Sequence, residues 1–597
     1  MSDSEKSESI GFGSSVRGLK WLLRDGSGPV VRSLSQKLAI PEVLASMIYH
    51  RGIDNAVDGE HFLSPKIKHA MSDPYMYKDM DKAVNRTIQA IVDHDKIAVF
   101  GDYDVDGATS TALLRRVFKK LMIDVITYIP HRLNEGYGLS KKALDVLHER
   151  GVNLVITVDC GMLSFEPVEY ANSIGIDVII IDHHLGLNTV PNAVAVVNPN
   201  RHDDTSQFKT MAAVGVVFMF VVALRSKLKA DGWFKEHNIE EPDLIQYLDI
   251  VALGTVCDVM PLQGLNRAFV FQGLKMISKR QNIGIRAVSN VINLSHKVHV
   301  YHLGYVIGPR INAGGRIGEG ILGSDLLSTD SYDEAYSIAL QLEKLNEERK
   351  AIESIALEEA MRQVEDKRLY DNTVILVHSE YWHAGILGIL ASKLKEKYLR
   401  PVMAVLVMEE IAKGSARSIA GMNVSKAVER AKANGLLLEG GGHAMAAGFT
   451  LNRTRLEEFH EYINLYLAND KETALANATI LDIDEIISLG ALNTELLTLI
   501  ERAGPFGQGN PVPRFAICDI VLTYCTIVGG KHILCVVSDG LGHSKSVKCM
   551  FFNGVQTKLG QTLLKSTGQK LSLAGTVQPN TFDDTQVSFV IEDAAFK

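Results

Sequence analysis

The first pattern along the chain is a set of apolar runs that each end abruptly in polar or ionisable side chains. The stretches "KIAVFGDYDVDG", "DVITYIP", "NLVITVDCG" and "DVIIIDHH" are typical of four strands between residues 96 and 184. Helical stretches lie between them, such as residues 109–121 and 140–150. Continuous apolar strands that alternate with helices predict an α/β fold, with a parallel sheet covered by helices on both faces.

The polar residues that follow these strands form one expected site. In parallel α/β sheets the carboxyl ends of the strands share one edge, and ligands bind outside that edge. The residues that follow the first, third and fourth strands are therefore expected to meet there: Asp102, Asp104, Asp106, Asp159, Asp182, His183 and His184.

This set of side chains is rich in carboxylates, contains imidazoles and lacks thiolates. Buried carboxylates need partners, and the mixture suits Mn²⁺ or Mg²⁺ better than a structural zinc, with imidazole favouring Mn²⁺. Two ions about 4 Å apart are a recurring device for phosphoester hydrolysis. For any single aspartate a helix N-cap is an equally good explanation. Acids at the ends of three strands together favour a two-metal site.

The rest of the chain predicts two further structural units. Residues 332–368 contain no Pro or Gly and many Glu and Lys, which predicts one long helix that joins two lobes across a cleft. A cleft of this kind suits a threaded strand, and the segment is too short for an autonomous coiled coil. After about Thr479, short strands separated by turns such as Gly529-Gly530 predict a small barrel.

Composition narrows the class of protein. The 597 residues are 46% hydrophobic and 22% charged, and the net charge of -8 argues against a generally basic nucleic-acid coat but not against a local basic groove. The six cysteines form no CxxC pair, so neither a zinc ribbon nor a disulfide framework is expected. The polar N-terminus lacks an apolar signal core, and the longest apolar run, residues 211–224, is shorter than the roughly 20 residues that span a bilayer. We expect a cytoplasmic, reduced enzyme that does not enter membranes.

Several motifs carry a resemblance to a known family. "GDYDVDG", "VDCG" and "DHH", followed by "GGGHAMAAG", resemble the DHH phosphoesterase superfamily with its companion DHHA1 domain. "PHRLNEGYGL", "ALGTVCDVMPL", "GPRINAGGRIG", "WHAGILGILASKL" and "PFGQGNPVPRF" resemble the RecJ family of bacterial single-stranded-DNA exonucleases over roughly residues 40 to 597. This resemblance implies a parallel-sheet DHH domain, a long helix, a DHHA1 α/β domain and a C-terminal OB-fold β-barrel.

The resemblance also implies roles for individual residues. One ion is expected near the acids of the first motif and the other near Asp106, His183 and Asp258, with Asp159 between them. How Asp102 and Asp104 divide between the ions stays open. Without the resemblance, Asp258 is an ordinary loop aspartate. His184 is expected beside the metals, against the scissile phosphate, and Asp182 either orients a histidine or is structural. The implied ligand set is Asp102, Asp104, Asp106, Asp159, His183 and Asp258.

Residues of the second lobe are candidates for substrate binding. The glycines at 440, 441 and 442 let a backbone approach a phosphate closely, and His443 can donate to it. Ser415 and Arg417 can clamp a phosphate, because the guanidinium fork matches its oxygens. By resemblance, Ser415, Arg417 and Arg310 contact the 5′ end or the backbone, and nearby nucleotides contact Trp382 and His383. The full set is Arg310, Trp382, His383, Ser415, Arg417, Gly441, Gly442 and His443.

Barrels of the OB type bind single strands through basic grooves and aromatic platforms. Candidates here are Lys531, Lys545, Lys548, Phe551 and Phe552, although core packing of the phenylalanines and a solubilising role for the lysines are equally good explanations.

The expected division of the chain follows from these motifs. It comprises an N-terminal helical region (1–75), the DHH catalytic domain (76–330), a connecting helix (331–368), the DHHA1 domain (369–468) and an OB-fold single-strand-binding domain (469–597).

The resemblance implies a metal-dependent 5′-to-3′ exonuclease that degrades single-stranded DNA to mononucleotides in DNA repair and recombination. It further implies help from a single-strand-binding protein and a helicase, and we expect a monomer. Two alternatives stay open. One is a related phosphodiesterase that acts on short oligoribonucleotides, cyclic dinucleotides or pyrophosphate. The other is a catalytically dead nucleic-acid-binding scaffold.

Overall fold

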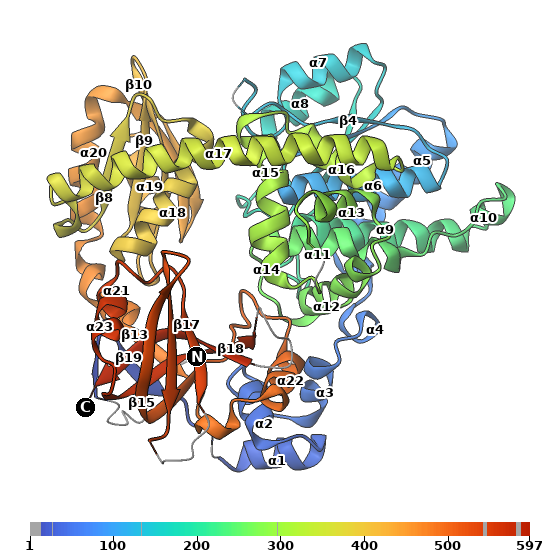
Figure 1. The fold of residues 1–597 in the computed structure, drawn as a ribbon. Coiled ribbons are helices and arrows are strands. Elements are labelled where there is room, and N and C mark those ends of the chain that lie inside the picture. Colours follow the sequence, from blue (N-terminus) through green and yellow to red (C-terminus); the bar gives the residue numbers. More distant parts are fainter. Residues whose placement is uncertain are drawn as a thin grey trace.

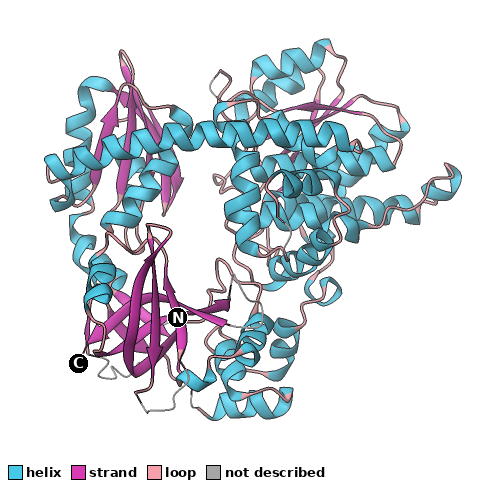
Figure 2. Cartoon of the chain, in the orientation of Figure 1, coloured by secondary structure: helices cyan, strands magenta, loops and turns pink. Residues whose placement is uncertain are grey.

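The computed structural model consists of two α/β lobes joined by one long helix, with a β-barrel below them (Figure 1). The structure describes residues 13–26, 28–132, 134–294, 297–540, 546–580 and 587–596. Figure 2 shows that helices dominate the first lobe, whereas most strands lie in the second lobe and the barrel. The predicted α/β fold class, with a DHH-type sheet, a connecting helix, a second α/β lobe and a barrel, is confirmed.

The first lobe contains a five-stranded parallel sheet with the order β4-β3-β5-β6-β7. Successive residues of β3 point to opposite faces. Val99 joins one buried cluster with the helices α5, α6 and α9, whereas Phe100 joins another with α7 and α8. The sheet is thus covered on both faces. Its elements are β3 (Ile97–Gly101), β4 (Val125–Tyr128), β5 (Leu154–Val158), β6 (Asp177–Ile181), β7 (Ala195–Val197), α5 (Met80–Val92), α6 (Val105–Lys120), α7 (Lys141–Glu149), α8 (Phe165–Ser173) and α9 (Ala213–Ala230).

A helical subdomain completes the first lobe and packs on α6. A side chain at Gly254 would collide with Thr109, so this glycine lets α11 approach α6 closely. The subdomain's elements are α11 (Leu248–Cys257), α12 (Gly264–Ser278), α13 (Ile283–Val291), α14 (Val300–His302), the π-helical turn η3 (Leu303–Ile307), α15 (Gly308–Ile317) and α16 (Ile321–Ser328).

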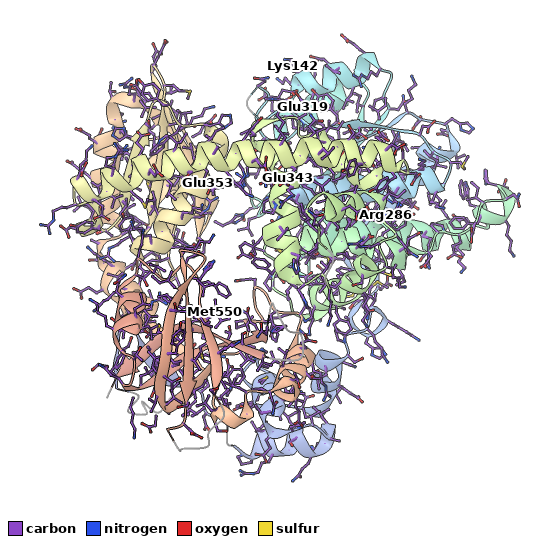
Figure 3. All side chains as sticks on the ribbon, in the orientation of Figure 1. Lys142, Arg286, Glu319, Glu343, Glu353 and Met550 are labelled. Carbon is purple, nitrogen blue, oxygen red and sulfur yellow. The ribbon has the colours of Figure 1, made fainter. Side chains whose placement is uncertain are left out.

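The connecting helix α17 (Tyr332–Asp366) extends from the first lobe to the second (Figure 1). The Ser331 side chain caps its N-terminus by accepting a hydrogen bond from the backbone N–H of Glu334. Figure 3 shows Glu343 and Glu353 along the helix. Glu343 pairs with Arg310 of α15 in the first lobe, whereas Glu353 pairs with Lys393 of α18 in the second. Ion pairs on one rigid helix thereby tie it to both lobes.

The second lobe has a five-stranded sheet with the order β11-β12-β10-β9-β8. Strands β8 and β9 are parallel and the other neighbours are antiparallel, which leaves the glycine-rich β11 at an edge. Its elements are β8 (Ile375–Ser379), α18 (Leu387–Tyr398), β9 (Val402–Val407), β10 (Ile411–Arg417), α19 (Val424–Ala433), β11 (Glu439–His443), β12 (Ala446–Asn452) and α20 (Leu456–Tyr466).

The C-terminal strands close into a barrel, because β15 pairs with β16, β16 with β17, β17 with β19, β19 with β18 and β18 with β15. The N-terminal segment belongs to this unit: β2 pairs with β13, and Leu34 and Leu44 share a buried cluster with Phe515 and Phe589 of the barrel. The elements are β2 (Lys20–Leu23), α1 (Pro29–Leu38), α2 (Glu42–Tyr49), α3 (Ala56–Leu63), β13 (Ile480–Ile483), α22 (Thr494–Ala503), β15 (Phe515–Val528), β16 (His532–Ser538), β17 (Val547–Phe551), α23 (Lys558–Lys565), β18 (Lys570–Pro579) and β19 (Val587–Phe596).

Two expectations from composition can be compared with the described residues. All six cysteines are free, although the Sγ atoms of Cys525 and Cys535 lie 3.3 Å apart on neighbouring strands. Within the described ranges, no helix combines the length and apolar character needed to cross a bilayer.

One arginine joins the first lobe to both ends of the chain. The Arg267 side chain of α12 donates hydrogen bonds to the carbonyl oxygens of Phe62 (3.0 Å), Ala503 (3.1 Å) and Gly504 (2.5 Å), and its guanidinium lies 3.7 Å from the centroid of the Phe62 ring. Burial lowers its pKa to about 9, with a further contribution from Arg51. The guanidinium therefore ties the first lobe to the N-terminal helices and to the segment that precedes the barrel.

We expect Arg267→Met to lower the free energy of unfolding by about 2–4 kcal/mol, because several buried carbonyl oxygens lose their donors at once. Thermal and urea unfolding followed by circular dichroism would measure the change. Arg362→Met, at an exposed position of α17, is the control and should unfold like the wild type. Equal unfolding midpoints for both variants would contradict the assigned role of Arg267.

Candidate active site

Three aspartates stand side by side at the carboxyl edge of the parallel sheet. Gly101 of β3 is in register with Val158 of β5, which is in register with Ile181 of β6. The residues that follow these three are Asp102, Asp159 and Asp182, and all three are buried. The sequence prediction that strand ends deliver acids to one edge agrees with this geometry.

The turn from β3 into α6 holds the remaining acids of the first motif. The Asp104 carboxylate caps α6 by accepting hydrogen bonds from the backbone N–H groups of Asp106 (2.9 Å) and Gly107 (3.1 Å). A side chain at Gly107 would collide with the backbone of Asp102, so the final glycine of "GDYDVDG" permits this tight turn. Asp104 therefore serves as an N-cap and also lies in one of the groups that could hold a metal.

The N-terminus of α9 holds the Asp106 carboxylate. The backbone N–H groups of Ala213 and Val214 donate to it at 2.6 and 2.9 Å. The first turn of a helix presents free N–H groups and the positive end of the helix dipole, which stabilises an anion. The 18-residue helix α9 thus fixes the position of Asp106.

His183 lies among carboxylates from three different elements. Its Nε2 is 3.3 Å from Asp159 Oδ1, 3.6 Å from Asp258 Oδ2 and 3.8 Å from Asp106 Oδ2. Asp258 follows α11 directly, and the close approach of that helix to α6 brings it here. Three groups of side chains could each hold a metal ion: Asp102 with Asp104 and Asp159, Asp106 with His183 and Asp258, and Asp159 with His183 and His184.

The electrostatics of this edge fit bound cations. Burial, followed by repulsion from neighbouring carboxylates, raises the pKa of Asp102, Asp159 and Asp258 well above the usual range and that of Asp106 to about 7. Among the described residues at this edge, three buried atoms lack a hydrogen-bond partner: Asp102 Oδ1, His183 Nε2 and Asp258 Oδ2. Carboxylate oxygens and imidazole nitrogen are ligands for Mn²⁺ and Mg²⁺, so the donor set fits these ions.

Asp182 differs from its neighbours because it has a full set of donors. Its carboxylate accepts from the backbone N–H groups of Met162 (3.0 Å), His183 (2.7 Å) and His184 (3.1 Å), and lies 2.8 Å from His184 Nδ1. Burial tends to raise its pKa, but the hydrogen bond and charge of His184 keep the pKa below the usual range. Asp182 therefore orients His184, which was one of two explanations left open by the sequence.

The glycine-rich edge strand of the second lobe faces the acidic site. The ring of His443 lies 6.4 Å from that of His184, centroid to centroid, at an interplanar angle of 18°. Gly442 has a φ of 153°, and a side chain there would collide with the backbone of Ala446. Around Gly441, by contrast, the space for a side chain is open. The backbone of β11 can thus lie close to a phosphate at the cleft.

A cluster of arginines lies next to the acids. Burial lowers the pKa of Arg316 to about 10, with further lowering by Arg132, Arg349 and Arg417, whereas Asp104 opposes the shift. Arg417 donates to Ser415 Oγ at 3.1 Å, and burial followed by Arg132 lowers its pKa. Within the described part of the chain, no carboxylate forms an ion pair with Arg132, Arg316 or Arg417. These guanidinium groups are available to an anion.

Two sequence candidates make other contacts in the structure. Both guanidinium edges of Arg310 are engaged, by Glu343 and by the carbonyl of Val306, so its charge is already balanced. Trp382 is buried in the core beneath α17, and its Nε1 donates to Glu359 at 2.8 Å. The Trp382 ring is therefore part of the hydrophobic core and offers no surface on which a base could stack. This burial disagrees with the expected contact between Trp382 and nucleotides.

The remaining candidates for substrate binding lie in the loop before α18 and in the barrel. His383 Nδ1 accepts a hydrogen bond from the backbone N–H of Gly385 (3.0 Å). The backbone carbonyl of the same Gly385 accepts a hydrogen bond from Arg316. In the barrel, Phe551 packs against the core, whereas Phe552 is half exposed beside His532. Lys531 and Lys548 are exposed, and Lys545 lies outside the described residues.

Sequence reasoning missed Arg132, Arg316 and Tyr137. The Tyr137 hydroxyl donates to the backbone carbonyl of Asp159 at 3.1 Å. The two arginines lie in the motifs "PHRLNEGYGL" and "GPRINAGGRIG", where a basic residue among glycines was the available signal.

Models of known protein families match the first lobe, the second lobe and the barrel separately. Three family models match: "DHH family, N-terminal domain" at residues 96–255, "DHHA1 domain" at 371–469 and "RecJ OB domain" at 483–593. Together they define a DHH-type protein with a DHHA1 lobe and an OB barrel.

Relatives identify the family within this class. The chain is 37% identical over 507 residues to the single-stranded-DNA-specific exonuclease RecJ of Escherichia coli K12, covering 83% of this chain and 87% of that protein. It is 32% identical to RecJ of Bacillus subtilis, covering 97% of this chain and 71% of that protein. The crystal structure of RecJ from Thermus thermophilus in complex with Mn²⁺ matches with a TM-score of 0.79 at 25% identity, covering 97% of this chain and 79% of that one. The chain belongs to the RecJ family.

We expect Asp182→Asn to lower activity about 10- to 100-fold, because the amide cannot accept from all four donors and His184 loses its orientation. Steady-state kinetics and Mn²⁺ affinity would measure the effect. The matched control is Asp249→Asn in the same lobe: the buried Asp249 carboxylate accepts from the backbone N–H of Ile250, and the oxygen of an amide can keep this hydrogen bond. Equal activity in the two variants would refute the orienting role.

Proposed function

We propose that this chain is a metal-dependent exonuclease that degrades single-stranded DNA from the 5′ end to mononucleotides. The observation that carries the proposal is the juxtaposition of a carboxylate cluster suited to cations with an arginine cluster that forms no ion pair with any carboxylate of the described residues. Metal ions and a phosphate end would meet between them. The family, whose named relatives are single-stranded-DNA-specific exonucleases, supports the same substrate.

Two divalent ions, Mn²⁺ or Mg²⁺, are proposed as cofactors. One would be held by Asp102, Asp104 and Asp159, and the other by Asp106, His183 and Asp258. Bound there, such ions lower the pKa of a water molecule and stabilise charge on the phosphoryl oxygens.

The chain's own groups position the reacting phosphodiester. Asp182 holds the imidazole of His184 toward the cleft, and the carboxylate of Asp159 lies 3.9 Å from His184 Nδ1. His443 reaches the same space from the opposite lobe. A phosphate along the edges of the two rings would accept from an N–H group of each imidazole, which fixes its orientation relative to the carboxylates.

Polarity is proposed to arise from the arginine cluster. A terminal phosphate carries more charge than an internal one and is matched by guanidinium forks, so Arg132, Arg417 and the Ser415 hydroxyl would favour a phosphorylated end. If the 5′ phosphate binds to these arginines, the first internal phosphodiester lies next to the acids. Hydrolysis there would release one nucleotide at a time.

The setting of the enzyme is also part of the proposal. One chain supplies both walls of the cleft, which supports a monomer. Free thiols suit the reducing cytoplasm. A helicase and a single-strand-binding protein would supply and present the substrate in repair and recombination.

The first test is a time course on single-stranded DNA labelled at either end, in Mn²⁺ or in EDTA. The 5′ label should be released at once as mononucleotide, EDTA should abolish the release, and Asp159→Ala should lower it more than about 100-fold, because a ligand matters more than a residue that orients one. Calorimetric titration with Mn²⁺ alone should show two ions in the wild type and fewer in Asp159→Ala. Release of the 3′ label first would refute the polarity, and cleavage of short RNA or cyclic dinucleotides alone would refute the substrate.

A second test concerns the end of the strand. We expect Arg417→Gln to raise KM for 5′-phosphorylated strands about 10- to 150-fold, since one charged hydrogen-bonding partner is lost, with little change for 5′-hydroxyl strands. Arg430→Gln on α19 is the control and should behave as wild type. An equal loss on both kinds of strand would show that Arg417 does not recognise the terminal phosphate.

A further inference from the structure

Three cysteines lie side by side on neighbouring strands of the barrel. Cys525 of β15 is the register partner of Cys535 of β16, and Cys535 is in turn the register partner of Cys549 of β17. The turn at residues 529–531 joins β15 to β16, so Cys525 and Cys535 belong to one hairpin. The fold therefore brings together thiols that the sequence keeps apart.

The sulfur atoms of the hairpin pair are already close to each other. Cys525 Sγ lies 3.3 Å from Cys535 Sγ. Residues directly opposite each other on antiparallel strands have Cα atoms about 4.5–5.5 Å apart, which is within the range that a disulfide bridges. Because a disulfide bond is about 2.0 Å long, the sulfur atoms need to approach by only about 1.3 Å, a movement that side-chain rotation can supply.

The two thiols of the hairpin differ in exposure and in acidity. Cys525 is partly exposed, whereas Cys535 and Cys549 are buried in the core of the barrel. The hydrogen bond from Cys535 lowers the pKa of Cys525, although burial opposes this shift. The same hydrogen bond, followed by burial, raises the pKa of Cys535. Because the thiolate is the reactive form, Cys525 is the thiol that an oxidant would meet first.

We propose that Cys525 and Cys535 are a redox-active pair that a hydroperoxide, such as hydrogen peroxide, converts to a disulfide. The Cys525 sulfur attacks one peroxide oxygen, the O–O bond breaks, and Cys525 becomes a sulfenic acid while its thiol proton leaves in a water molecule. The Cys535 sulfur then attacks the Cys525 sulfur, the S–O bond breaks, and a second water molecule takes the Cys535 proton. Two thiols are oxidised by two electrons, and one hydrogen peroxide is reduced to two water molecules.

A disulfide at this place would tie β15 to β16 near the tip of their hairpin. Between the pair and the turn, Ile527 and Val528 are exposed and are the register partners of Ile533 and His532. Exposed strand ends open more easily than buried strands, so a covalent link there should reduce local opening. The thiol pair needs neither bound metal nor DNA, and its chemistry is separate from the proposed nuclease activity.

The test uses the full chain, reduced with dithiothreitol and then exposed to hydrogen peroxide without reductant. Thiol titration after denaturation should show the loss of two of the six thiols, and fresh dithiothreitol should restore both. Peptide mapping without reduction should find Cys535 joined to Cys525, with fragmentation to separate Cys525 from Cys518, because trypsin leaves these two in one peptide. Amide hydrogen exchange at residues 526–534 should be slower in the oxidised chain than in the reduced one.

Variants separate the roles of the three thiols. Cys525→Ser should lose no thiol under the same exposure. Cys535→Ala removes the partner, so Cys525 should stop at the sulfenic acid, which dimedone labels. Cys549→Ala is the matched control, because it removes the thiol on the other side of Cys535 and should still form the disulfide.

Three results would each overturn the redox pair: a wild-type chain that keeps all six thiols, a link between Cys535 and Cys549, and equal thiol loss in the wild type and Cys525→Ser. Unchanged hydrogen exchange at residues 526–534 in the linked chain would overturn the expected effect on the hairpin. Loss of nuclease activity in the reduced wild type would bear on the proposed function and not on the thiol pair.

Discussion

Mutual repulsion among carboxylates at one end of a parallel sheet is the constraint on which this structure depends. The sheet places Asp102, Asp159 and Asp182 at the ends of three successive strands, which lie about 4.8 Å apart. Such a cluster is unfavourable in a protein interior unless donors or cations surround it. The N-terminus of α9, the cap of α6 and the histidine pair supply part of what is needed. Bound ions would supply the rest, so cation binding and the stability of the lobe should be linked.

Acids and arginines lie next to each other where the two lobes meet. The first lobe contributes acids at strand ends, whereas Arg316 and Arg417 come from both lobes and meet beside Asp104. A cation site and an anion site next to each other would bind a phosphodiester from two sides, as neither does alone. The long helix α17 makes this possible, because its ion pairs to α15 and α18 hold the lobes at a set spacing.

The sequence predicted those site residues whose positions follow from the strand they end. It did not predict the residues that reach the site through contacts between segments far apart in the chain. Asp102 and Asp159 follow apolar strands, so the geometry of parallel sheets was enough to bring them together. Asp258 reaches the site only because Gly254 lets one helix approach another, and no periodic pattern signals that contact. The pairing of β2 with β13 joins segments more than 400 residues apart, and the isolated N-terminal helices gave no sign of sharing the barrel's core. Trp382 was misplaced for a different reason. A tryptophan in the sequence is compatible both with a buried position and with a surface that binds nucleotides.

Hydrogen bonding, rather than burial, distinguishes a metal ligand from its support at this edge. Asp102 and Asp182 are both buried, and they follow the strands β3 and β6 of the same sheet. Asp182 has four donors and a lowered pKa, whereas Asp102 keeps an oxygen without a partner and a raised pKa. A carboxylate whose lone pairs are all engaged by N–H groups has little left for a cation, and one with a free oxygen is a candidate ligand. By the same reasoning Asp258, with a buried Oδ2 that lacks a partner, is a candidate ligand, whereas Asp182 holds the histidine.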